Sequence, residues 1–150
     1  MIRDRIGEET KQAMKSGDEA RLSTLRLVSS AIKNADIEAR SQGKDAPSDD
    51  ALLGLLQKLV KQRQESAELY DKGARPELAA AERAEIVVIQ SFLPQQMSED
   101  ETRAAIAAAI KDTGAISVKD MGKVMAALRA QHAGKMDFGK VSGAVKTMLS

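Results

Sequence analysis

Hydrophobic residues along this chain recur at intervals of three and four positions, which places them on one face of an α-helix. No segment shows the strict alternation of apolar and polar residues that is typical of a half-buried β-strand. The sequence therefore predicts an all-α protein. The pattern predicts helices over residues 2–16, 19–40, 48–70, 76–89 and 98–112, followed by two shorter helices.

The predicted helices fall into two groups, separated at a proline. Pro94 cannot donate a backbone hydrogen bond and restricts the conformation of the residue before it, so it interrupts the helical pattern. We therefore expect an N-terminal four-helix bundle-like domain at residues 1–93 and a small three-helix C-terminal domain at residues 98–150. Residues 94–97 are the expected linker.

Two polar pairs predict helix starts in the C-terminal domain. Ser98 and Glu101 have the spacing of a capping box, in which a hydroxyl and a carboxylate each accept a hydrogen bond from the other residue's amide. Ser117 and Asp120 have the same spacing, and the shorter Asp makes this second pair a weaker example.

A five-residue pattern occurs twice near the end of the chain. The two copies are Asp120-Met121-Gly122-Lys123-Val124 and Asp137-Phe138-Gly139-Lys140-Val141. Apolar residues at helical spacing follow each copy, so each predicts the start of a helix. A helix start with a lysine beside a small residue is suited to a phosphate group. In the alternative interpretation, Asp137 caps the last helix, while Gly122 and Gly139 let the last two helices approach closely.

The composition weakens most catalytic classes. The chain has no Cys and a single histidine, His132, so it cannot form a Cys/His zinc site or a cysteine nucleophile. Residues 134–140 match the spacing of a nucleotide-binding P-loop, but Val141 replaces the Ser or Thr that would bind magnesium. We therefore expect no catalytic residue, no metal and no cofactor.

Positive charge is concentrated at the C-terminus. The net charge is +1, yet residues 119–150 carry +4 and the remainder carries −3. An anionic partner at this end is one interpretation, and a solvated lysine-rich surface is the other. The chain has neither an apolar run long enough to span a membrane nor a secretory signal, so the sequence predicts a cytoplasmic protein without a membrane partner.

Several motifs in a fixed order give the chain a family resemblance. They are Leu25-Arg26-Leu27-Val28-Ser29-Ser30-Ala31-Ile32-Lys33-Asn34, Lys61-Gln62-Arg63-Gln64-Glu65-Ser66-Ala67, Phe92-Leu93-Pro94-Gln95-Gln96-Met97-Ser98 and both Gly-Lys-Val repeats. Tyr70, Gly73, Glu77-Leu78-Ala79, Glu82 and Glu85 lie between the second and the third of these motifs. On these residues the chain resembles the GatB/YqeY family over nearly its whole length. The resemblance implies an all-helical protein with an N-terminal bundle and a small C-terminal tail domain. The tail domain is similar to the tail of the B subunit of the tRNA-dependent amidotransferase, and in that enzyme the tail engages tRNA.

The resemblance also implies RNA-binding residues in both domains. Those in the tail are Gly122, Lys123, Gly139, Lys140 and Lys146, and those in the bundle are Arg26, Lys33, Lys61 and Arg63. The alternative interpretation of the bundle residues is an ordinary solvated helix surface.

Three functions remain open at this point. The first is a non-catalytic module that binds tRNA or another structured RNA through the basic tail. The second is an accessory module that docks on a protein partner, favoured by the near-zero net charge and by the scarcity of aromatic residues for base stacking. The third is the carbon-nitrogen ligase activity with glutamine as amide donor that the family resemblance implies, for which no catalytic residues are found.

Overall fold

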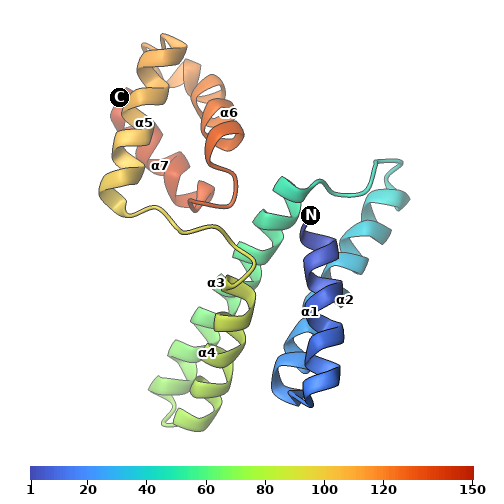
Figure 1. Cartoon of the computed structure of the whole chain (residues 1–150). Coiled ribbons are helices and arrows are strands. Elements are labelled where there is room, and N and C mark those ends of the chain that lie inside the picture. The colour runs from blue at the N-terminus through green and yellow to red at the C-terminus, as the bar shows by residue number, and fades with distance from the viewer. The chain divides into compact units, whose positions relative to one another are not determined.

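A computed structural model describes residues 1–150 and contains no strand, which confirms the all-α prediction. Figure 1 shows the helices in chain order. They are α1 (Ile2–Ser16), α2 (Glu19–Ser41), α3 (Asp49–Lys72), α4 (Pro76–Gln90), α5 (Glu99–Thr113), the 3-10 helix η1 (Val118–Asp120), α6 (Met121–His132) and α7 (Phe138–Leu149). None of them has a stretch both long and apolar enough to cross a membrane.

Polar caps fix the helix starts that the sequence predicts. The Ser48 hydroxyl accepts a hydrogen bond from the Ala51 amide at 3.2 Å and begins α3. At α5 the capping box is complete, because Ser98 Oγ accepts from the Glu101 amide and Glu101 Oε1 accepts from the Ser98 amide, both at 3.1 Å. The Ser98 backbone and hydroxyl bonds hold the pKa of Glu101 below its usual value.

The chain divides into two compact units, Met1–Leu93 and Pro94–Ser150. In the N-terminal unit α3 packs along α4 and α1 along α2, while α2 also contacts α3 and α4 (Figure 1). Their apolar faces meet in one core. The fully buried members include Leu25, Val28, Leu52, Leu56, Ile89 and Phe92.

An ion pair joins α3 to α4 in this unit. Arg63 Nε donates to Glu85 Oε2 at 2.8 Å, and Arg63 Nη1 donates to the Leu59 carbonyl at 3.1 Å. The arginine side chain is 12% exposed and the glutamate 34%. Replacing one partner of such a pair lowers the free energy of unfolding more than replacing one partner of a fully exposed pair. The reason is that the remaining partner is left incompletely solvated.

Replacement of this arginine should destabilise the N-terminal unit. We expect Arg63→Met to lower the free energy of unfolding by about 1–2 kcal/mol, because it keeps the aliphatic stem and removes both hydrogen bonds. Urea denaturation measures the loss. The control is Lys58→Met on the same helix, an exposed position that should change stability by less than about 0.5 kcal/mol. Equal losses of stability in the two variants would contradict the role of Arg63 in joining α3 to α4.

A second ion pair joins α1 to α2. Arg3 Nη1 and Nη2 donate to the two carboxylate oxygens of Asp36 at 2.8 and 2.7 Å. These hydrogen bonds from the Arg3 guanidinium hold the pKa of Asp36 below its ordinary value of 3.8. Because the folded pKa is the lower one, the pair stabilises the fold above pH 3.8, and this contribution is lost as the pH falls through the lowered pKa.

The acid sensitivity of this pair is measurable. We expect the wild-type chain to be more stable than Asp36→Asn at neutral pH, and the difference to shrink once the pH drops below 3.8. Chemical denaturation at neutral pH and near pH 3 gives the two differences, with Asp45→Asn in the loop after α2 as the control. A difference between wild type and Asp36→Asn that stays constant across this range would contradict the assignment.

The C-terminal unit has its own core. Helix α6 contacts both α5 and α7, and α5 also contacts α7 (Figure 1). Ile106, Val124, Leu128 and Val145 are fully buried where the three helices meet. Two glycines with positive φ, Gly114 and Gly134, let the chain turn after α5 and before α7.

Candidate functional site

The second copy of the repeat begins helix α7 with a capped N-terminus. Asp137 Oδ1 accepts hydrogen bonds from the amides of Gly139 at 3.0 Å and Lys140 at 3.4 Å. The amides that would otherwise receive a phosphate are therefore satisfied by a carboxylate of the chain itself. The structure favours the capping interpretation of this copy over a helix-terminus phosphate seat.

The first copy begins a helix in a different way. Asp120 ends η1 and makes no side-chain cap to α6. Its Oδ2 instead accepts from the Ile116 amide at 3.0 Å, and this bond lowers the pKa of Asp120, with smaller effects from Ser117 and Lys123. The Ser117 hydroxyl makes no cap, and Asp120 bonds to the amide of Ile116 in place of that of Ser117, so the expected second capping box does not form. Two similar sequences thus form two different helix starts.

The glycines of the repeat do not bring the two helices close together. A Cβ placed on Gly122 would meet no atom within 4 Å, and one placed on Gly139 would meet only Asp137 Oδ1 at 3.2 Å. The interpretation in which Gly122 and Gly139 permit close helix packing is therefore wrong. Both glycines are exposed.

The lysines expected from the sequence lie on the surface of the C-terminal unit. Lys123 on α6 and Lys140 and Lys146 on α7 are exposed, and the structure records no salt bridge for their ammonium groups. Helix α7 also carries no acidic residue. Lys140 and Lys146 each stand three residues from Gly143, so they flank it by about 4.5 Å along the helix axis, on the side away from buried Val141 and Val145. We call Lys140, Gly143 and Lys146 the α7 lysine face.

The four remaining predicted residues lie in the N-terminal unit. Arg26 and Lys33 are exposed on α2, seven residues apart, and Lys61 is exposed on α3. Arg63 is the exception, because its guanidinium bonds to Glu85 and to the Leu59 carbonyl. The structure gives Arg63 a role in joining two helices.

The sequence analysis missed a pocket of about 450 Å³ in the C-terminal unit. Its walls are the first halves of α5 and α7, and the short segment before each of these two helices closes it. The lining residues are Gln96, Met97, Glu99, Thr102, Arg103, Ile106, Lys135, Met136, Asp137, Lys140, Val141 and Ala144. One signal was available in the sequence, since Glu99, Thr102, Arg103 and Ile106 have the spacing of a single helix face.

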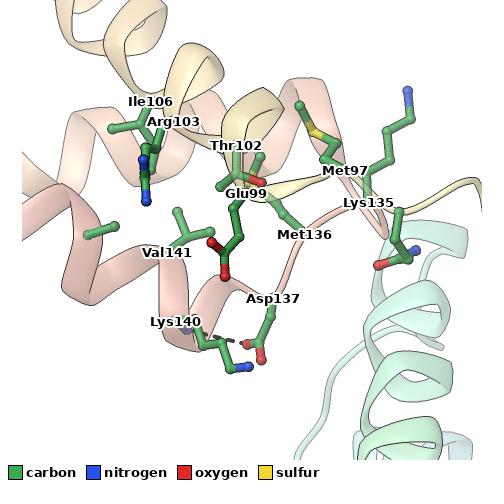
Figure 2. A pocket seen from close by; sticks show the side chains of 12 residues that line it. Met97, Glu99, Thr102, Arg103, Ile106, Lys135, Met136, Asp137, Lys140 and Val141 are labelled. Atoms are coloured by element: carbon green, nitrogen blue, oxygen red, sulfur yellow. Dashed lines mark hydrogen bonds between the residues drawn. The ribbon is translucent and has the colours of Figure 1, made fainter.

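The pocket has an apolar floor and a charged rim. Ile106, Met136 and Val141 are buried. Figure 2 shows the Glu99 carboxylate and the Arg103 guanidinium pointing into the space between α5 and the start of α7. The two closing segments are tied together: the Met97 amide donates to the Lys135 carbonyl at 2.9 Å, and Gln96 Nε2 donates to the Gly134 carbonyl at 2.6 Å. These two hydrogen bonds join the segment before α5 to the segment before α7 at one end of the pocket.

No group of three or more His, Cys, Asp or Glu side chains lies close enough to hold a metal ion. His132 is the last residue of α6 and is half-buried.

Comparison with known proteins identifies relatives. A family model described as "Yqey-like protein" matches residues 3–149. Three relatives, from Lachancea thermotolerans, Vanderwaltozyma polyspora and Pyrenophora tritici-repentis, are named "Altered inheritance of mitochondria protein 41, mitochondrial". The first is 40% identical over 60% of this chain and 46% of its own length, and the second 38% over 59% and 46%. The third is 26% identical over 99% of this chain and 71% of its own length.

These names contradict the cytoplasmic location predicted from the sequence, because the relatives are named as mitochondrial proteins. The prediction rested on the lack of a membrane span and of a secretory signal, and neither feature distinguishes the cytoplasm from the interior of an organelle. The chain spans about half the length of the first two relatives. The match of the family model covers nearly every residue, from the first helix to the last, and the chain therefore belongs to the YqeY-like protein family.

Proposed function

We propose that this chain is a non-catalytic module that binds structured RNA, and tRNA in particular, through its C-terminal unit. The observation that carries the proposal is the α7 lysine face: two exposed lysines without salt bridges on a helix that has no acidic residue. Lysines that form no salt bridge with a carboxylate are available to bind phosphates. Binding of their ammonium groups to the phosphates releases counterions from the RNA.

The shape of the α7 lysine face supports contact with an RNA backbone. A Cβ at Gly143 would meet no atom within 4 Å, so the surface between the two lysines is open and low. A phosphate can then reach both ammonium groups without displacing a side chain. Lys123 on α6 adds a third exposed cation in the same unit. We assign the α2 residues Arg26 and Lys33 a minor part.

In this proposal the N-terminal helices serve as a bundle-like scaffold, and the C-terminal unit acts in the manner of the amidotransferase B-subunit tail that the family resemblance implied. The proposal assigns no catalytic residue, metal or cofactor to the chain.

A protein-docking role is the second candidate, and one observation favours it. Ile116 is 88% exposed and Val118 40% exposed in the segment between α5 and α6, beside Lys119. Exposed apolar patches are typical of surfaces that meet another protein. The two candidates differ in their response to salt, since apolar docking does not release counterions.

Binding of fluorescently labelled tRNA at several salt concentrations tests the proposal. We expect weak binding. The logarithm of the affinity should fall with the logarithm of the salt concentration with a slope of about −2 to −3, because three lysine–phosphate contacts contribute roughly 0.7 to 0.9 each. Fluorescence anisotropy measures the affinity. Absence of binding at low salt, or an affinity independent of salt, would contradict the proposed RNA-binding function and favour the docking role.

A further inference from the structure

We propose that the pocket between α5 and α7 receives a single unpaired guanine of the bound RNA. The inference rests on the proposed RNA-binding function and adds what that function lacks, namely a means of selecting one nucleotide. Phosphate contacts alone position an RNA and carry no sequence information, whereas a base held in a pocket does.

The shape of the pocket suits a flat, largely apolar ring with a polar edge. Its volume is about 450 Å³, within the range of pockets that enclose small ligands. The thioether chains of Met97 and Met136 line it together with Ile106. Methionine sulfur makes favourable contacts with aromatic rings, so these residues provide ring contacts in a protein with few aromatic side chains.

The polar groups at the rim favour guanine among the bases. Glu99 begins α5 and its carboxylate points into the pocket, where it can only accept hydrogen bonds (Figure 2). Guanine presents two adjacent donors, N1–H and the 2-amino group, on its Watson–Crick edge. Each of them can donate to one of the two carboxylate oxygens. The other carboxylate, Asp137, already accepts from two backbone amides through Oδ1. Arg103, one turn after Glu99, offers a guanidinium plane on which a base can stack.

The pocket is continuous with the proposed phosphate-binding surface. Lys140 belongs to the α7 lysine face and also lines the pocket. A base turned into the pocket therefore has its own phosphate group near an exposed ammonium. The rim of the pocket carries three cationic and two anionic side chains, a small positive excess that complements a nucleotide.

Three RNA hairpins test the inference: one fully paired, one with a single bulged guanine and one with a single bulged adenine. We expect the wild-type chain to bind the bulged-guanine hairpin about tenfold more tightly than either of the others, as measured by fluorescence anisotropy at one low salt concentration. This is the discrimination expected of one bidentate base contact.

Two variants assign the preference to the pocket. Glu99→Gln should remove most of the preference for guanine over adenine, because it loses an acceptor oxygen, while binding of the paired hairpin stays within about twofold. Its control is Asp100→Asn, an exposed neighbour outside the pocket lining. Ala144→Phe should fill the pocket and abolish the preference for the bulged guanine over the other two hairpins, and its control is Ala108→Phe on the exposed side of α5. Circular dichroism checks folding, and Glu99→Gln decides if Ala144→Phe does not fold.

The outcomes separate this inference from the proposed function. Equal binding of all three hairpins by wild type, or a guanine preference that survives Glu99→Gln and Ala144→Phe alike, would overturn the guanine site while leaving phosphate binding intact. The pocket would then suit another occupant, such as a side chain of a protein partner. Failure to bind any hairpin at low salt would overturn both.

Discussion

Reversing the charge of both lysines on the α7 lysine face is expected to weaken RNA binding strongly. In the Lys140→Glu/Lys146→Glu variant, two phosphate contacts are replaced by two repulsions. We expect the affinity for tRNA to fall by roughly tenfold or more, and the salt slope of the residual binding to approach about −1, the contribution of Lys123. Fluorescence anisotropy against salt concentration gives both quantities.

The N-terminal unit offers a control with the same change of charge. Arg26→Glu/Lys33→Glu also replaces two exposed cations on one helix, so both double variants change the net charge of the chain from +1 to −3. If binding depended only on net charge, the two variants would lose affinity equally. We expect the α2 variant to lose several-fold less, because its residues have only a minor part in the interface. Equal losses would contradict the placement of the interface on α7.

Truncation of Leu128 is expected to have the largest effect on stability. Its side chain is fully buried between the three helices of the C-terminal unit, so Leu128→Ala should cost about 2–5 kcal/mol through lost burial and the cavity left behind. Units of about 60 residues are only marginally stable, and this cost approaches the whole stability available to residues 94–150. We therefore expect the C-terminal unit to unfold at ambient temperature.

Backbone amide NMR signals distinguish this local unfolding from a general loss of structure. In Leu128→Ala, the amide signals of the C-terminal unit should move to the narrow range of chemical shifts that is typical of an unfolded chain. The control is Met148→Ala, which shortens an apolar side chain that is 44% exposed in the same unit and should leave the spectrum folded. A spectrum of Leu128→Ala that remains folded would contradict the assignment of Leu128 to the core.

Helix boundaries were the part of the fold that the sequence predicted well. Capping depends on residues close together in the chain, so Ser48 at α3 and the Ser98–Glu101 pair at α5 are visible in the sequence alone. Ser117 and Asp120 show the limit of this approach. Asp120 bonds instead to the amide of Ile116, one residue further back, because η1 precedes α6.

The candidate site was predicted less completely, for a different reason. Exposed cations such as Lys140 and Lys146 follow from helix periodicity, because an amphipathic helix places its charged residues away from the core. The pocket depends on α5, α7 and the segments before them, which come together only after folding. The Arg63–Glu85 pair likewise joins positions 22 residues apart on two helices, and no local pattern marks it.

Mapping the RNA contact by NMR is the most direct test of the central claim, that the α7 lysine face of the C-terminal unit binds structured RNA. Unlabelled tRNA is added to the ¹⁵N-labelled full chain at low salt, and the amide signals are followed. We predict the largest shifts or broadening at Lys140, Gly143 and Lys146, smaller effects at Lys123, and recovery of the free spectrum as salt is raised. Perturbations centred on Arg26 and Lys33, or no perturbation at low salt, would contradict the account.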